Sequence, residues 1–257
     1  MIIRPKPQRC ILQRHLPLAR GLVAAWPFDD GAGKIVRDGA GTNHGTAVTS
    51  GTWVAGPHGG TAMRFNGTTD LVVVSSAAFD RVTGDPMTVS VWLKPYALTS
   101  YHDIVANRCA AQEYTWVLVV LPSRNIQLWT ASGPCTSFPT VDLNLWQHFV
   151  VTQSAAGLQA LYKNGVLLGT STGNGYKVNS PAALGIGGGN FNQNEFINAD
   201  ISDVRVYNRA LALWEVKELY NDPYAIWRPE EMTMSAVAFL AAWWHRKRIR
   251  EQRSGVR

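Results

Sequence analysis

The chain has 257 residues, of which 46% are hydrophobic and 10% aromatic, and it contains ten Trp, 23 Gly and 13 Pro. A hydrophobic fraction of this size can fill a core, while so many Gly and Pro residues favour turns and exclude a mainly helical protein. The formal net charge is +6, and it is unevenly spread along the chain.

The two ends of the chain are basic and its centre is slightly acidic. Residues 1–21 carry five basic side chains and no acid, and residues 226–257 carry seven basic and three acidic ones. Residues 22–225 therefore hold twelve basic and fifteen acidic side chains. Because a nucleic-acid-binding domain carries its basic stripe on the folded body, we expect no specific nucleic-acid partner. The basic ends either dock on an acidic surface or serve only solubility.

No targeting or membrane-spanning segment is expected. The start, MIIRPKPQRC, lacks the apolar region of a signal peptide. The longest apolar stretch, 235–244, has about ten residues, whereas a transmembrane helix needs about 20. The sequence thus predicts a soluble protein made in a cytoplasm.

The first predicted element is an extended N-terminal arm over residues 1–21, because Pro5, Pro7 and Pro17 prevent regular helix or central strand there. From residue 22 onward the hydrophobic pattern has a period of two, which indicates strands. Short strands follow, bounded by turn residues, at 21–28, 34–38, 44–48, 61–67, 71–76, 87–95, 102–107, 114–121, 126–131, 146–154, 158–172 as a hairpin, 183–188 and 200–207.

Two of these segments carry the clearest patterns. In 87–95, Met87, Val89, Val91 and Leu93 should lie on one side of a strand, and Thr88, Ser90, Trp92 and Lys94 on the other. In 158–172, the dipeptide Asn164-Gly165 predicts a type I′ hairpin turn.

Two helices are expected near the C-terminus. The first spans 213–221, keeps the Glu215 half of a capping box without a capping side chain, and should lay Trp214, Leu219 and Tyr220 over one end of the sandwich. The second spans about 230–253 and ends in the basic run HRKRIR. We expect it to dock on a partner, on the flank of the sandwich or on a membrane surface.

The number and spacing of the strands predict an all-β fold, an antiparallel β-sandwich or jelly roll. The expected domains are a basic N-terminal arm at 1–21, a jelly roll at 22–222 and a C-terminal extension with a basic amphipathic helix at 223–257. The extensions are the predicted docking segments, through Arg4, Lys6, Arg9, Trp243, Trp244, Arg246, Lys247 and Arg248.

Five segments in order, GLVAAWPFDDGAGKIVRDGAGTNHGT, AMRFNGTTDLVVV, MTVSVWLKP, WQHFVVTQSAAGLQALYKNGVLLGT and DISDVRVYNRAL, resemble laminin-G-like, concanavalin A-like jelly-roll domains from about Gly21 to Asn221. The flanks RHLPLARGLV and ELYNDPYAIWRP resemble laminin-G-like proteins encoded by tailed phages. The resemblance implies two facing antiparallel sheets and, in many relatives, glycan or protein recognition. It does not imply catalysis. The chain departs from it at Ala199, Ser202-Asp203 and Ala212.

Some members of this fold hydrolyse glucans, and that reaction needs two carboxyl groups flanking the bond. Here Glu113 and Glu195 are the only glutamates between residues 22 and 210, and neither belongs to an alternating acidic strand. Asp200 and Asp203 are an odd number of residues apart and should face opposite ways on a regular strand. We therefore expect no enzyme, with an endoglycanase as the remaining alternative.

A structural Ca²⁺ would need six to eight oxygen ligands. The candidate ligands are Asp70 and Asp203, with Asn66 and Asp200 as helpers. In the alternative, Asp70 closes a turn through backbone hydrogen bonds and Asp203 pairs with Arg205.

Glycan binding needs exposed aromatic faces beside amide or carboxyl groups. In the predicted hairpin over 114–131, Tyr114 and Trp116 would share an outer face with Trp129, while Val117, Val119, Ile126 and Leu128 would face the core. Gln127 and Asn192 would rim this platform. In the alternative, the tryptophans pack in the core.

Cys109 and Cys135 flank the same hairpin at similar distances from its turn and either pair across strands or remain separate thiols, with Cys10 left over.

These observations favour a non-enzymatic virion structural or decoration protein of a tailed phage. Its partners would be capsid or tail subunits, further copies of the chain and a host-surface glycan. The alternative is a free carbohydrate-binding module.

Overall fold

A computed structural model of the chain describes residues 10–110, 113–130, 133–139, 141–172, 183–189 and 195–229. Arg4, Lys6, Arg9, Asn192 and the candidate docking residues of the predicted second helix lie outside these ranges.

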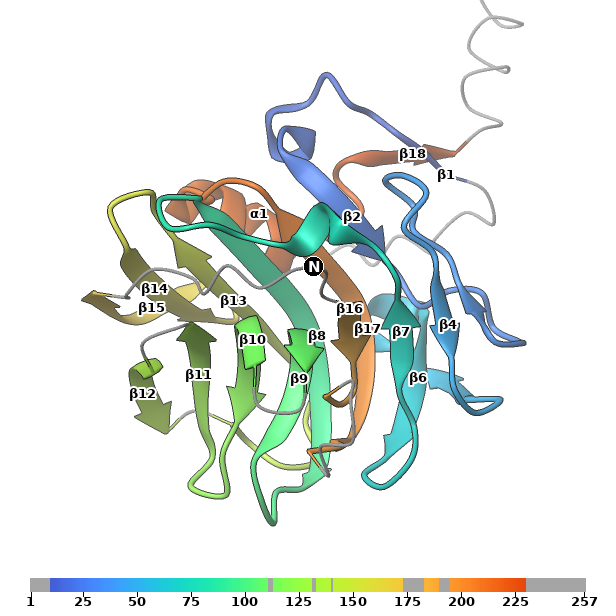
Figure 1. Ribbon diagram of the computed structural model, residues 1–257. Coiled ribbons are helices and arrows are strands. Elements are labelled where there is room, and N and C mark those ends of the chain that lie inside the picture. Colours follow the sequence, from blue (N-terminus) through green and yellow to red (C-terminus); the bar gives the residue numbers. More distant parts are fainter. Residues whose placement is uncertain are drawn as a thin grey trace, which may run out of the picture.

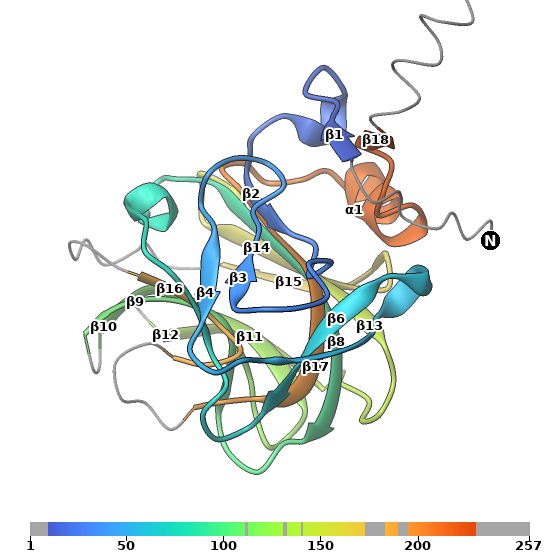
Figure 2. The same ribbon diagram turned by 90° about the vertical axis from the view of Figure 1, so that its right-hand side faces the viewer.

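Two antiparallel eight-stranded sheets face each other, which confirms the predicted all-β sandwich (Figures 1 and 2). The first sheet has the order β12 (Gly133–Pro139), β11 (Asn125–Thr130), β10 (Glu113–Val120), β9 (His102–Ala110), β16 (Ala183–Ile186), β7 (Val72–Val74), β4 (Gly45–Ala47), β3 (Ile35–Val36). The second has the order β15 (Val166–Thr172), β14 (Leu158–Lys163), β13 (Gln147–Gln153), β8 (Met87–Ala97), β17 (Asn198–Tyr207), β6 (Thr61–Asn66), β5 (Thr52–Ala55), and β2 (Leu22–Trp26) also pairs with β17. Short 3₁₀ turns lie at Pro17–Ala19, Pro57–Gly59 and Ala77–Phe79.

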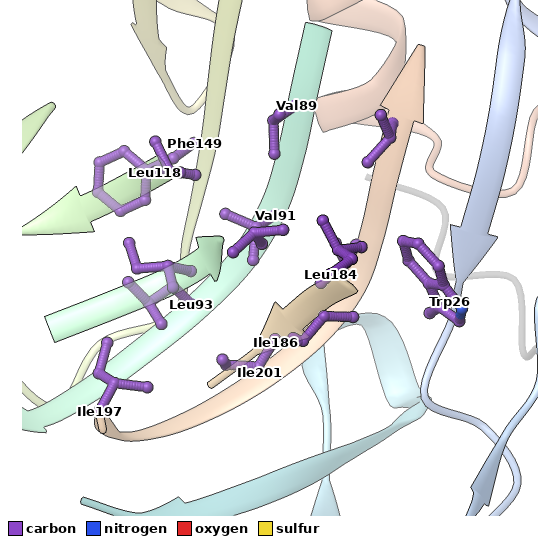
Figure 3. Close-up of a cluster of buried hydrophobic side chains, with 14 of the residues drawn as sticks. Trp26, Val89, Val91, Leu93, Leu118, Phe149, Leu184, Ile186, Ile197 and Ile201 are labelled. Atoms are coloured by element: carbon purple, nitrogen blue, oxygen red, sulfur yellow. The ribbon is translucent and has the colours of Figure 1, made fainter. Parts of the chain in front are cut away.

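The main core fills the space between the sheets (Figure 3). The alternation predicted for 87–95 is confirmed, because Met87, Val89, Val91 and Leu93 are all buried in this core. Phe149 of the neighbouring strand β13 and Leu118 of β10 in the facing sheet belong to the same core. Period-2 burial thus places every second side chain of β8 on the outer face of its sheet.

The hairpin between β14 and β15 has the predicted turn. Asn164 and Gly165 have φ angles of 51° and 76°, and Lys163 pairs with Val166 across them. Two successive positive φ angles are the requirement that Asn-Gly satisfies with little strain.

The hairpin between β10 and β11 forms, but its predicted facing is wrong for β10. Val117 is opposite Trp129, so these two share the outer face, while Trp116 is fully buried in the main core and its Nε1 donates to the Phe79 carbonyl at 2.9 Å. Ile126 and Leu128 face the core as predicted. A one-residue difference in register moves every side chain of a strand to the other face.

The predicted first helix is α1 (Leu213–Asn221), which lies over the outer face of the second sheet (Figure 2). The Glu215 carboxylate accepts from the Ala212 backbone N–H at 2.9 Å, which is the predicted half of a capping box. Leu219 is buried and Tyr220 stacks on Trp92 of β8, with 5.8 Å between ring centroids. Trp214 does not pack on the sandwich, because it is 57% exposed.

Both ends of the described chain meet in a separate two-stranded sheet. In it, β1 (Cys10–Leu12) pairs with β18 (Trp227–Pro229), Cys10 opposite Pro229 (Figure 1). Leu18 and Ala19 are buried beside α1. The domain boundaries at 22 and 222 remain a prediction, although residues on both sides of them pack on the sandwich.

The order of the strands in the first sheet bears on whether Cys109 and Cys135 can form a disulfide. Cys109 lies on β9 and Cys135 on β12, and β10 and β11 lie between these strands. Three strand spacings amount to about 14 Å, twice the longest Cα–Cα distance that a disulfide spans. From this separation of their strands we predict that Cys109 and Cys135 do not form a disulfide with each other.

Candidate functional site

The outer face of the first sheet carries a small apolar patch with polar neighbours. Val117 and Val119 of β10 are buried there with Ala106 of β9. The register places Trp129 beside Val117 and Gln127 beside Val119. β11 therefore presents an aromatic and a carboxamide side chain to the same face.

Two aromatic rings meet on this face. The Trp129 and Tyr101 rings are 5.7 Å apart and inclined at 68°. Trp129 is half-buried and Tyr101 is 44% exposed. Trp129 Nε1 donates to Gln127 Oε1 at 2.7 Å, which fixes the orientation of the indole. Such an edge-to-face pair presents rigid apolar surface beside a polar group.

A charged trio lies on the same side of the sheet. Asp103 is opposite Val119, and its Oδ2 accepts from Arg108 Nε at 2.8 Å. Arg108 also contacts the carboxylate of Glu195, whose side chain is 28% exposed. Burial raises the pKa of Asp103 despite the opposing effect of Arg108. We call Tyr101, Gln127 and Trp129, with this trio, the Trp129 site.

The predicted glycan platform is thus partly corrected. Gln127 and Trp129 do lie together on the outer face, but Trp116 is a core residue and belongs to no platform. Tyr114 lies on β10 opposite Arg108, and its side chain, like Asn192, lies outside the described residues. The sequence offered no signal for Tyr101 or Glu195, because Tyr101 meets Trp129, 28 positions away, and Glu195 meets Arg108, 87 positions away.

Two of the proposed Ca²⁺ ligands complete a turn. The Asp70 carboxylate accepts from the Asn66 backbone N–H at 3.0 Å and from Thr49 Oγ1 at 2.7 Å. Asn66 Oδ1 in turn accepts from the backbone N–H groups of Thr68 and Thr69. Asp70 therefore closes a turn through a backbone hydrogen bond, as the alternative to Ca²⁺ binding predicted.

The other two ligand candidates serve separate ion pairs. Asp200 binds Arg64, with Nε at 2.7 Å from Oδ1, and Asp203 binds Arg205 through two hydrogen bonds of 2.8 Å. Over the described ranges, no group of three or more His, Cys, Asp or Glu side chains could hold a metal ion.

The prediction that Asp200 and Asp203 face opposite ways is wrong, for a local reason. Asp203 has a φ of 47° and lies in a β-bulge where the pairing of β17 with β8 shifts between Ser202 and Arg205. The extra residue turns the Asp203 side chain towards Arg205, on the outer face that Asp200 also occupies.

None of the helices in the described part of the chain has the length and apolar character to cross a membrane.

Three solved structures show how widely this architecture occurs. Domain 4 of AbnA, a GH43 extracellular arabinanase from Geobacillus stearothermophilus in complex with arabinotriose, is 21% identical at a TM-score of 0.62, over 77% of this chain and 98% of that one. The binding domain of Paraclostridial Mosquitocidal Protein 1 is 19% identical at 0.64, over 81% and 53%. Trypanosoma rangeli sialidase is 16% identical at 0.63, over 84% and 36%, so the chain spans about a third of that enzyme.

These likenesses concern the fold alone, and no curated protein matches the sequence. A laminin G family model, described as the concanavalin A-like lectin/glucanases superfamily, matches residues 66–217, which include most strands of both sheets and the start of α1. The chain therefore belongs to the concanavalin A-like lectin/glucanases superfamily.

Proposed function

We propose that the chain is a non-enzymatic recognition protein that binds a glycan at the Trp129 site and is displayed on the virion of a tailed phage. The Tyr101–Trp129 pair carries the recognition part of this proposal. An exposed aromatic edge with a fixed carboxamide and the partly exposed Glu195 carboxylate suits the apolar faces and hydroxyl groups of a sugar ring. The arabinotriose complex of the AbnA domain supports a glycan as ligand on this fold.

A glycan array with the full chain tests this part. The variant Trp129→Ala should lose binding by about tenfold or more, because aromatic anchors dominate such sites. The control is Trp214→Ala, which removes an exposed indole from α1, on the outer face of the other sheet. A blank array, or equal losses in both variants, would count against glycan recognition at Trp129.

The charged trio supports the non-enzymatic part. Asp103 is fully buried, and Arg108 lies between its carboxyl group and that of Glu195. Glycoside hydrolysis needs two carboxyl groups that reach the bond from separate positions. We expect no release of reducing ends from common polysaccharides, and turnover that disappears in Glu195→Gln would overturn this part.

The pairing of β1 with β18 favours display from one anchor point. Cys10 is paired with Pro229 in this two-stranded sheet, so the first and last described residues lie side by side. Figures 1 and 2 both place β1 and β18 away from β11, which carries Trp129. An anchor there leaves the Trp129 site accessible.

Display on the virion can be tested with virions purified from the lysate in which the chain is produced. The full chain should appear in them by mass spectrometry, whereas a chain lacking 1–9 and 230–257 should stay in the supernatant with an unchanged melting temperature. Light scattering on both forms would test the predicted homo-oligomer. Absence of the full chain from virions would favour the free carbohydrate-binding module instead.

A further inference from the structure

A second polar cluster lies on the outer face of the other sheet. Asp200 of β17 is paired on one side with Arg64 of β6 and on the other with Lys94 of β8. The neighbouring residues Phe65, Leu93, Ala199 and Ile201 are buried in the main core. Because side chains alternate along a strand, Arg64, Asp200 and Lys94 form one row on the outer face.

Asp200 orients two of its neighbours. Its Oδ1 accepts from Arg64 Nε at 2.7 Å, and its Oδ2 accepts from Arg64 Nη2 at 3.1 Å and from the Tyr96 hydroxyl. Arg64 Nη2 also donates to Tyr96 Oη at 2.6 Å. The Asp200 side chain is 3% exposed while that of Arg64 is 46% exposed, so a buried acid fixes the plane of an accessible guanidinium.

The row has more positive than negative charge. The negative charge of Asp200 neutralises the positive charge of Arg64, and Lys94 forms no ion pair within the described residues. The Lys94 ammonium lies 5.6 Å from the centre of the Tyr96 ring. Arg64 Nη1 makes no hydrogen bond in the described part of the chain, so one edge of the guanidinium remains open. Two cations and one anion leave a single positive charge to be matched.

We propose that Arg64 and Lys94, held in place by Asp200 and Tyr96, bind the carboxylate of an acidic sugar residue, such as a uronic acid of a host-surface polysaccharide. A carboxylate is planar and accepts from a guanidinium edge and an ammonium together. Its single negative charge equals the net positive charge of Arg64, Lys94 and Asp200 together, whereas a dianion would leave one negative charge without a partner.

A cross-strand brace that joins β6, β17 and β8 would need Arg64, Asp200 and Tyr96 alone. Such a brace does not need Lys94, whose ammonium lies near the Tyr96 ring without a carboxylate partner in the described part of the chain. Lys94 is therefore the residue whose loss separates binding from bracing. This inference shares with the proposed function only the class of ligand, a glycan, and concerns a different face.

Isothermal titration of the full chain with tetragalacturonate at moderate salt tests the proposal. The variant Lys94→Gln should bind about tenfold more weakly, the size expected for one charge-assisted hydrogen bond at a partly exposed site. The control is Lys217→Gln on the exposed face of α1, which should bind within about twofold of the parent. Methyl-esterified tetragalacturonate should not bind, because its carboxylates are blocked.

Three outcomes would overturn the proposal: no binding of tetragalacturonate, an equal loss in Lys94→Gln and Lys217→Gln, or an unchanged affinity in Lys94→Gln. Equal melting temperatures of the parent and Lys94→Gln are the control for folding. Titration of Trp129→Ala separates this site from the other one. If Trp129→Ala loses tetragalacturonate and Lys94→Gln does not, the second site is refuted while glycan recognition at Trp129 stands.

Discussion

Trp116 and Trp129 lie on adjacent strands of one hairpin and face opposite sides of the first sheet. Trp116 is fully buried in the main core with its indole N–H bonded to a carbonyl, whereas Trp129 is half-buried on the outer face. The same residue type therefore has a structural role on β10 and a proposed binding role on β11.

We expect Trp116→Ala to lower the free energy of unfolding by about 3–5 kcal/mol, because it leaves a large cavity and removes one of the two hydrogen bonds that the Phe79 carbonyl accepts. Trp129→Ala should lower the free energy of unfolding by clearly less, since the Trp129 side chain is partly exposed in the folded state. Urea unfolding of both variants measures the difference. Equal costs would mean that the two indoles are equally buried in solution.

His148 is the residue that should make stability depend on pH. Its Nε2 lies 2.8 Å from Ser90 Oγ, and its ring stacks on Trp92 at 5.0 Å beneath Tyr220 of α1. Burial, followed by the charges of Arg205 and His58, lowers the pKa of His148 to about 3. The folded chain therefore keeps this ring neutral while the unfolded chain protonates it near pH 6.5.

Because the unfolded state binds more protons between about pH 6.5 and pH 3, stability should fall as the pH is lowered through this window. The full contribution, up to about 5 kcal/mol, is present above pH 6.5 and lost at about pH 3. Urea unfolding of the parent and of His148→Gln from pH 7 to pH 4 isolates this residue. The variant should lose less stability on acidification, and His44→Gln, at an exposed histidine, is the matched control. Parallel curves for the parent and His148→Gln would contradict the assignment.

At the scale of the elements, the bulge in β17 is the feature that most changes the chemistry of the surface. It places Asp203 against Arg205, whose side chain is 1% exposed and also donates to the Pro223 carbonyl after α1. The bulge thus ties the strand to the segment that follows the helix.

The variant Asp203→Asn keeps a residue that tolerates positive φ but removes the charge that Arg205 needs. We expect a loss of about 3–5 kcal/mol, because a buried guanidinium then lacks its anion. The double variant Asp203→Asn/Arg205→Met should recover part of this loss. Chemical unfolding of the three chains checks both expectations, and a single variant as stable as the parent would refute a buried ion pair.

At the scale of the whole molecule, the strand order decides which distant segments meet. It brings β1 to β18 and places β2 beside β17, so the two ends of the domain lie together. It also separates β9 from β12, which carry Cys109 and Cys135.

We therefore expect the same melting temperature with and without a thiol reductant. Thiol titration of the denatured, unreduced monomer should find three free thiols per chain, the full cysteine content. A value of one would show an intramolecular disulfide and a different order of strands in the first sheet.

Features that depend on near neighbours along the chain could be predicted from the amino-acid sequence. The alternation in 87–95, the Asn164-Gly165 turn and the limits of α1 follow from side-chain period and local backbone preference, and all three are present. The sandwich fold follows from many such strands at regular spacing.

The composition of the two candidate sites, in contrast, follows from the pairing of strands that are distant in the chain. The facing of Trp116, the outward turn of Asp203 and the meeting of Tyr101 with Trp129 depend on how strands pair, and a slip or bulge of one residue reverses a face. The row of Arg64, Asp200 and Lys94 comes from three strands whose residues are up to 136 positions apart. No local pattern records such pairings, because their energy comes from contacts that exist only once both sheets have formed.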